Sequence, residues 1–351
     1  MKENINQSGK LLSLEASRGV AAILVVLFHA GAIMNLPKYF GEMPLNGFFS
    51  FGYAGVDFFF VLSGFIILYV HYGDIGRKEQ LGSYFSKRFV RIYPIHWIVT
   101  LIFIAGLLIY PLREMPDIDK VIRSFLLLPQ EGYPLGVVAW TLIHEVSFYL
   151  LFGVLIASRA IGSMVLVFWF FSVVIGVNYI QEDAGYLQKF FFSAHNLEFL
   201  LGMGVAWMIR HKSVRQLWRL SGLLGVIIFS FSAWLNSNSG ISPNLLVALY
   251  AVGSALIIYA LVCGDQTGSL KDPSKWLVFF GAASYSIYLI HFLALSVFIK
   301  VLLKLGANDI LPLTINYLVL AAFAVAAGSL LHLYVEKPVL VWLRQKMLPA
   351  R

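Results

Sequence analysis

The sequence predicts an all-α, polytopic integral membrane protein with about ten transmembrane helices and both termini in the cytoplasm. Three observations support this fold class. Apolar residues make up 59% of the 351 residues, charged residues make up only 13%, and the apolar residues gather in long runs. Soluble domains are about 45–50% apolar and about 25% charged. The composition therefore excludes a soluble enzyme and a disordered chain.

The apolar runs divide the chain into spans, each of which needs about 20 mostly apolar residues. Ten such runs are predicted, at residues 12–34, 50–72, 92–111, 138–158, 163–180, 195–209, 220–236, 244–263, 279–303 and 312–335. The sixth is the weakest, because it is short and carries His195, Asn196 and Glu198. The segments between the spans are short, so we expect residues 1–351 to form a single membrane domain.

The basic residues predict how the spans are oriented. With the N-terminus inside, the inner segments hold 18 of the 26 Lys and Arg residues, including Lys2 and Lys10, and the outer loops hold 6. Lys and Arg gather in cytoplasmic loops of membrane proteins, so both termini are predicted to be cytoplasmic. The same bias accounts for the net charge of +8 without a nucleic-acid partner. Cys263 is the single cysteine, which excludes a disulfide framework and a cysteine metal site.

Ionisable residues inside the spans are the main indication of function, because they are costly in a membrane. Arg18 and His29 are eleven residues apart, so they share one helix face and lie about 16 Å apart along it. Asp57 in the second span and Glu145 in the fourth are expected at a depth similar to that of His29. An imidazole beside carboxylates suits general-base chemistry. The residues leave open which carboxylate orients His29, with Glu145 preferred, and a purely structural contact is the alternative.

A second group of basic residues precedes the third span, where Arg88 and Arg91 are three residues apart with Lys87 beside them. On a helical turn the two arginines point the same way, and the guanidinium fork suits phosphate. Alone, such residues are also the ordinary charge of a cytoplasmic loop. Glu336, at the inner end of the last span, is expected to cap a helix or to pair with a basic neighbour.

The ninth span places Tyr285, Tyr288 and His291 along one side of the helix. Tyrosines at this depth must find hydrogen-bond partners, either one another or a substrate. No metal site is predicted. His144 and Glu145 adjoin, but the segment HEVSF lacks the second histidine of the zinc-binding helix pattern.

These segments resemble the motifs of the acyltransferase family 3 membrane proteins. LEASRGVAAILVVLFH is similar to the family's opening, with its arginine and histidine at Arg18 and His29, although Glu-Ala-Ser-Arg stands where many relatives have Asp-Gly-Leu-Arg. GYAGVDFFFVLSGF resembles the second motif and FSKRFVRIYP the cytoplasmic Arg-x-x-Arg motif. WTLIHEVSFY, SYSIYLIH and the late EKP resemble further blocks. The resemblance covers about residues 11–340.

The resemblance implies transfer of an acyl group, most often acetyl, from cytoplasmic acetyl-CoA to a carbohydrate hydroxyl at the bacterial inner membrane. Acyl-CoA is then a co-substrate, and no permanently bound cofactor is expected. In the family the histidine that matches His29 is taken as catalytic, and the arginines that match Arg18, Arg88 and Arg91 as needed for function. Many members carry a C-terminal SGNH-hydrolase-like domain. This chain ends 16 residues after the last predicted span and resembles the stand-alone form.

Together, the residues and the resemblance predict a mechanism in which the three arginines bind acyl-CoA and His29 removes the proton of the acceptor hydroxyl. Glu145 or Asp57 orients His29, and Tyr288 and His291 are candidates for binding substrate or stabilising the oxyanion. An acyl-histidine intermediate is an alternative.

The expected partners are acyl-CoA, membrane lipids and a polysaccharide, lipopolysaccharide or lipid-linked glycan acceptor, with a periplasmic or glycan-synthesis protein as a further candidate. Two other classes of function stay open. A transporter or flippase of a lipid-linked sugar or small metabolite would move its substrate without covalent change. A structural or sensory protein would use its buried polar groups only to hold helices together.

Overall fold

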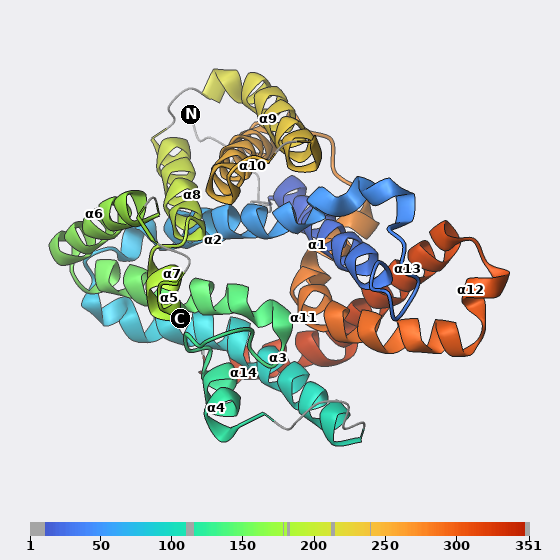
Figure 1. Cartoon of the computed structure of the whole chain (residues 1–351). Helices are drawn as coiled ribbons and strands as arrows, with labels where there is room; N and C mark the ends of the chain where they lie inside the picture. The colour runs from blue at the N-terminus through green and yellow to red at the C-terminus, as the bar shows by residue number, and fades with distance from the viewer. Residues whose placement is uncertain are drawn as a thin grey trace.

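The computed structural model describes residues 11–109, 116–177, 179–180, 183–211, 215–238 and 240–347, and every regular element in them is helical (Figure 1). The α-helices are α1 (Leu12–Met34), α2 (Gly55–His71), α3 (Leu81–Ile109), α4 (Ile118–Leu126), α5 (Trp140–Ala157), α6 (Arg159–Gly176), α7 (Tyr186–Phe191), α8 (His195–Arg210), α9 (Trp218–Asn238), α10 (Pro243–Gln266), α11 (Lys275–Lys304), α12 (Ala307–Ile310), α13 (Leu313–Leu331) and α14 (Lys337–Met347). Tighter or wider turns are η1 (Pro44–Ala54), η2 (Tyr72–Asp74), η3 (Lys78–Gln80), η4 (Val137–Ala139), η5 (Arg215–Leu217) and the π-turn η6 (His332–Glu336). The predicted all-α class is confirmed.

Nine helical segments of the described chain are long and apolar enough to cross a membrane, and each overlaps one predicted span. The weak sixth span forms α8, which has 16 residues. Such a helix rises about 24 Å, less than the roughly 30 Å of a bilayer core. The multi-pass membrane fold is therefore confirmed. The side on which the termini lie stays a prediction, and Lys2 and Lys10, which contribute to it, lie outside the described residues.

Helix α3 begins at Leu81, eleven residues before the predicted span. The early part of α3 carries several charged residues, so it is not part of an apolar run in the sequence. Lys87, Arg88 and Arg91 consequently lie on a continuous helix, which also contains Pro94. The two arginines therefore share a helix face, as their spacing predicts.

Helices α1 and α11 pack closely and run in the same direction. A Cβ atom on Gly281 would lie 1.8 Å from the backbone oxygen of Glu15, so only glycine permits this approach. Arg18 bonds to Ser284 near the start of both helices, and His29 contacts His291 further along both. The equal direction agrees with the predicted alternation, in which the first and ninth spans both run outward.

Helices α2 and α8 form a second close and parallel pair. A Cβ atom on Gly202 would lie 1.9 Å from the backbone oxygen of Val61. His195, at the start of α8, lies beside Asp57, and the guanidinium of Arg210, at its end, lies 4.4 Å from the ring centroid of Tyr72. The short helix α8 therefore runs beside α2 along most of the length of α2.

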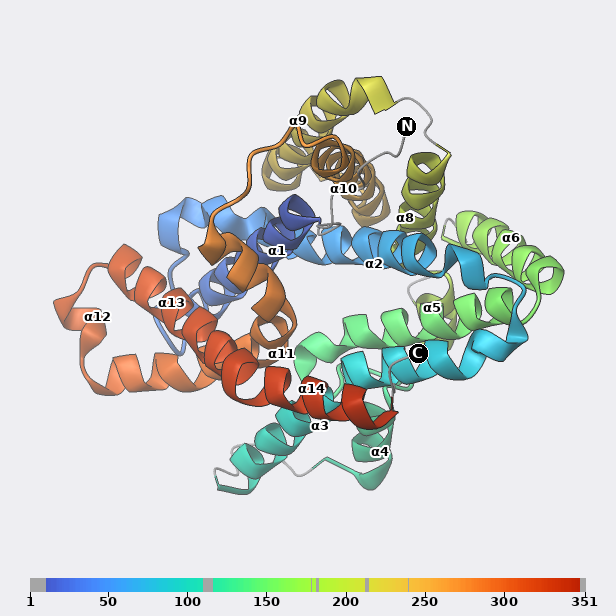
Figure 2. The same ribbon diagram turned by 180° about the vertical axis from the view of Figure 1, so that it is seen from behind.

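Other helices pack around these two pairs. Helices α9 and α10 lie side by side at one edge of the molecule in both views (Figures 1 and 2). Figure 2 shows α14 crossing in front of α3, where the chain returns to the basic segment after α13. This return brings η6 and α14 to the same end of the molecule as Arg88 and Arg91.

The glycine contact between α1 and α11 gives a stability prediction. Gly281→Ala should lower the free energy of unfolding by at least about 1–3 kcal/mol, because the added methyl group overlaps the backbone of α1. The measurement is the thermal unfolding midpoint of the detergent-purified protein. Gly204→Ala is the matched control, since a Cβ atom there meets nothing within 4 Å. Equal midpoints for the two variants would contradict the close packing.

Candidate active site

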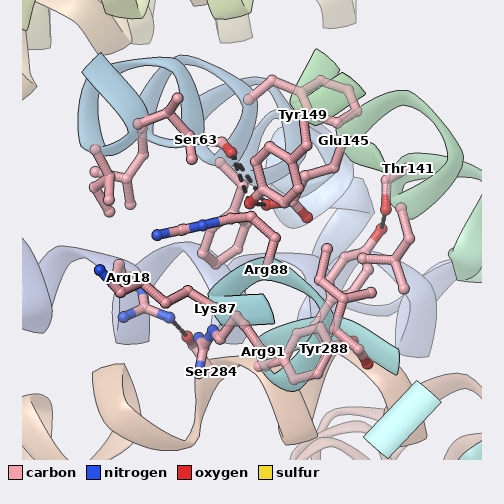
Figure 3. Close-up of a pocket in the computed structure, with 18 of the residues that line it drawn as sticks. Arg18, Ser63, Lys87, Arg88, Arg91, Thr141, Glu145, Tyr149, Ser284 and Tyr288 are labelled. Carbon is pink, nitrogen blue, oxygen red and sulfur yellow. Dashed lines mark hydrogen bonds between the residues drawn. The ribbon is translucent and has the colours of Figure 1, made fainter. Parts of the chain in front are cut away.

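A cavity of about 580 Å³ lies between α1, α2, α3, α5 and α11 (Figure 3). Its volume is within the range of ordinary small-molecule sites. Five basic residues line it: Arg18, Lys87, Arg88, Arg91 and Arg344. Figure 3 shows the charged ends of Arg18, Lys87 and Arg88 on the same side of the cavity. Glu145 is the one acidic residue among the described residues that line it.

Arg18 is held at the junction of α1 and α11. Its guanidinium donates to the carboxylate of Glu15 at 3.2 Å and to the hydroxyl of Ser284 at 3.0 Å. Ser284 is buried and lies one turn beyond the close contact at Gly281. The packing of the two helices therefore fixes the direction in which Arg18 enters the cavity.

Arg88 is positioned by a chain of two hydrogen bonds. Its Nη2 donates to Nε2 of His71 at 3.1 Å, and Nδ1 of His71 donates to Asp74 at 2.7 Å. The guanidinium also lies 5.6 Å from the ring centroid of Tyr149. Its Nε atom is buried and has no hydrogen-bond partner in the described part of the chain. Arg88 thus has one donor that is not hydrogen-bonded within these residues.

Arg91 pairs with Glu336, which confirms the expectation of a basic partner for this glutamate. The Nη1 atom of Arg91 lies 3.2 Å from Oε1 of Glu336, whose side chain is 0% exposed. Ser286 and His332 each donate to the other carboxylate oxygen at 2.7 Å. The π-turn η6 places Glu336 at this point. The late EKP segment therefore serves to hold the arginine of α3.

The side chain of Glu145 is directed towards the cavity and not towards His29. Its carboxylate accepts hydrogen bonds from Ser63 of α2, at 3.0 Å, and from the hydroxyl of Tyr149 one turn further along α5. Figure 3 shows these three side chains together beside Arg88. Glu145 is therefore placed to meet whatever the arginines bind.

Tyr288 lines another part of the cavity. Its hydroxyl lies 2.9 Å from the hydroxyl of Thr141 and 3.2 Å from the backbone oxygen of Val138. Its ring centroid is 5.7 Å from that of His291. Tyr288 consequently separates the cavity from the histidine pair behind it. His29, Asp57 and His291 are not among the described residues that line the cavity.

His29 and His291 form a pair whose hydrogen bonds define their tautomers. Nδ1 of His291 lies 2.6 Å from the backbone oxygen of Tyr288, so it carries the proton, and Nε2 of the neutral ring is an acceptor. That Nε2 lies 3.2 Å from Nδ1 of His29, which is also 3.0 Å from the backbone oxygen of Val25. Nδ1 of His29 therefore carries the proton, and its Nε2 has the lone pair that a general base needs.

The expectation that Glu145 or Asp57 orients His29 differs from the structure. His29 is oriented by Val25 and His291 instead of by a carboxylate. Asp57 lies beside His195 of α8, 3.7 Å from its Nδ1 atom. The depth of a residue along its helix does not specify which neighbouring helix its side chain faces.

The structure does bring together the predicted arginines, Glu145 and Tyr288 around one cavity. Sequence reasoning missed Ser284, which holds Arg18, and four further polar residues that line the cavity, Ser63, Thr141, Tyr149 and Arg344. All but Arg344 are uncharged, and Arg344 is indistinguishable by sequence from other basic residues of an inner segment. The structure also places Asp57, His195 and Glu198 close enough to hold a metal ion. The helical spacing within α8 could have indicated the last two, since they are three residues apart.

The ion pair of Arg91 gives a second stability prediction. Glu336→Gln should lower the free energy of unfolding by about 2 kcal/mol, because three donors lose a buried charged acceptor. Glu15→Gln is the matched control, since its partially exposed pair with Arg18 is expected to contribute less than about 1 kcal/mol. Thermal unfolding of both variants in nanodiscs tests the order. A larger loss for Glu15→Gln would show that Glu336 does not stabilise this end of the bundle.

Comparison with known proteins agrees with the motifs. The acyltransferase domain family matches residues 11–334. The acyltransferase MdmB of Streptomyces mycarofaciens is 26% identical over 94% of this chain and 91% of its own length. The exopolysaccharide production protein ExoZ of Rhizobium meliloti is 28% identical over 83% of this chain and 90% of its own. No solved structure shows significant similarity. The match over most of the chain shows that this membrane protein belongs to acyltransferase family 3.

Proposed function

We propose that this protein transfers an acyl group, most often acetyl, from cytoplasmic acyl-CoA to a hydroxyl of a cell-surface or lipid-linked carbohydrate at the bacterial inner membrane. The observation that carries the proposal is the cavity between α1, α2, α3, α5 and α11. Five basic residues line it, and it reaches Tyr288, whose ring lies next to His291. The cavity thus extends from an anion-binding group of side chains towards a histidine base.

The charge of the cavity supports a phosphate-bearing donor. Arginine binds phosphate through two parallel N–H groups, and bonds of this kind are roughly twice as strong as neutral ones. The buried Nε of Arg88 has no partner among the described residues. Lys87 and Arg344 form no ion pair with a carboxylate in the described chain. The phosphates of CoA would supply the missing negative charge, and the predicted orientation puts this end of the cavity in the cytoplasm.

The chemistry assigned to His29 follows from its tautomer. Nε2 accepts the proton of the acceptor hydroxyl while the hydroxyl oxygen attacks the thioester carbonyl carbon. The new C–O bond forms, the C–S bond breaks, and the CoA thiolate leaves and takes up the proton from His29. Val25 and His291 keep the other ring nitrogen protonated, so the imidazolium is held by two acceptors. Tyr288 is the candidate donor for the oxyanion, after releasing the backbone oxygen of Val138.

The acceptor class rests on the relatives. One matching relative is named for exopolysaccharide production and another is named an acyltransferase. Both match along nearly their whole length, so the comparison concerns the complete membrane domain. A carbohydrate hydroxyl fits a base that removes one proton from a neutral alcohol.

Replacing the base tests the reaction. His29→Gln should lower acetyl transfer at least about a hundredfold, which is the low end of what a general base contributes, and should leave CoA binding unchanged. The measurement is release of free CoA thiol and transfer of labelled acetyl to a membrane glycan extract by the protein in nanodiscs. His96→Gln is the control, because His96 is buried but bonds to Ser124, away from the cavity.

The results separate the alternatives. Full transfer by His29→Gln would exclude the base assignment. Movement of a glycan across the membrane by the wild type, without thiol release, would instead indicate the flippase.

Replacing the arginines tests the donor site. Arg88→Ala should weaken CoA binding by about tenfold to a hundredfold, the loss expected for a charge-assisted contact, and adding Arg91→Ala should weaken it further. Binding is measured by isothermal calorimetry in nanodiscs. Pantetheine, which lacks the phosphates, should bind weakly and equally to all variants.

Arg210→Ala is the matched control, because Arg210 lies over Tyr72 and does not line the cavity. If CoA binds equally to the wild type and to the double variant, the cavity does not recognise the phosphates.

A further inference from the structure

Asp57, His195 and Glu198 form a buried cluster away from the cavity described above. Asp57 comes from the first turn of α2, and the other two come from the first turn of α8. Nδ1 of His195 lies 3.1 Å from Oε2 of Glu198 and 3.7 Å from Oδ1 of Asp57. One ligand atom from each of the three residues lies within 4.8 Å of the other two. Three groups that commonly bind metals therefore converge on one point.

The two carboxylates of the cluster are poorly compensated. Each is only 1% exposed, and Oδ1 of Asp57 and Oε1 of Glu198 have no hydrogen-bond partner among the described residues. Among the described residues, His195 is the ion-pair partner of both carboxylates. Buried charges need pairing or metal coordination. The side chains of Asp57 and Glu198 also lie within hydrogen-bond reach of each other. Two carboxylates beside one imidazole are compensated either by a proton that they share or by a bound cation.

An opening leads to the cluster from one side. A second cavity, of about 270 Å³, is lined by His195 together with residues of α7, α10 and the segments that flank α7. Besides His195, the polar side chains in its lining are those of Lys189, Ser193 and Asn244. This cavity has room for several water molecules. It provides both a path for a hydrated ion and a place for a water ligand.

We propose that Asp57, His195 and Glu198 bind a divalent transition-metal ion of the Zn²⁺ type. Neighbouring ligands of a tetrahedral site with bonds of about 2.1 Å lie about 3.4 Å apart, and the two distances from Nδ1 of His195 fall on either side of this value. Imidazole is a ligand for Zn²⁺ and similar ions, whereas Mg²⁺ and Ca²⁺ prefer oxygen. A water molecule from the second cavity completes the coordination. The ion neutralises both carboxylates and joins the start of α8 to α2.

The experiment uses the full-length, tag-free protein in detergent, stripped with a chelator and then dialysed against Zn²⁺ or Co²⁺. Elemental analysis after desalting should give about one metal per chain for the wild type. The Co²⁺ form should show visible absorption typical of a low-coordinate N/O site, and Zn²⁺, but neither Mg²⁺ nor Ca²⁺, should raise the unfolding midpoint.

Variants assign the ligands. Asp57→Asn, Glu198→Gln and His195→Gln should each raise the Kd for Zn²⁺ at least tenfold, since even indirect partners of a metal contribute this much. Asp265→Asn is the control, because this carboxylate bonds to Ser13 at another place in the bundle and should leave the Kd unchanged.

Two results would overturn the proposal. The first is a wild-type protein that binds neither Zn²⁺ nor Co²⁺ stoichiometrically, which would mean that the carboxylates share a proton. This measurement does not depend on whether any variant folds. The second is a Kd that stays unchanged in all three ligand variants. Neither readout involves acyl transfer, so this test can fail independently of the proposed function.

Discussion

The close contact of α1 with α11 determines the geometry of the candidate active site. Without a side chain at Gly281, the backbones of the two helices meet, and their parallel direction then aligns two polar pairs. Arg18 meets Ser284 at one level, and His29 meets His291 further along. In a bilayer, such helix contacts depend on small residues and on hydrogen bonds rather than on the hydrophobic effect. One packing interaction thus sets the positions of both Arg18 and His29.

The arginines of the cavity are each held by a partner outside it. Glu15 holds Arg18, His71 holds Arg88 and Glu336 holds Arg91, so the side chains are fixed while part of each guanidinium still faces the cavity. Fixing these side chains before a ligand arrives lowers the entropy lost on binding. This arrangement also explains why a buried glutamate stands at the end of η6. Its carboxylate orients Arg91.

The sequence was sufficient to predict most of the fold and one part of the site. Long apolar runs mark the spans, and helical spacing correctly placed Arg88 and Arg91 on one face. It could not predict the neighbours of Asp57 and His29, because the rotation of one helix against another depends on packing that periodicity does not contain. In the sequence, His195 and Glu198 only make the sixth span less apolar than the others. Ionisable residues are energetically costly inside a membrane, so their presence in a span is also an indication of function.

Helix α2 separates two polar groups of different chemistry. Ser63 faces the basic cavity and bonds to Glu145, whereas Asp57 faces the start of α8. The two residues are six positions apart, which places their side chains about 120° apart around the helix. The α2–α8 pair therefore faces the basic cavity on one side and encloses the two buried carboxylates where α2 meets α8. Gly202 lets α8 approach α2 closely. A metal ion that neutralises the carboxylates between these helices would therefore stabilise α2, which also supplies Ser63 to the cavity. The proposed metal would act on catalysis only through this support.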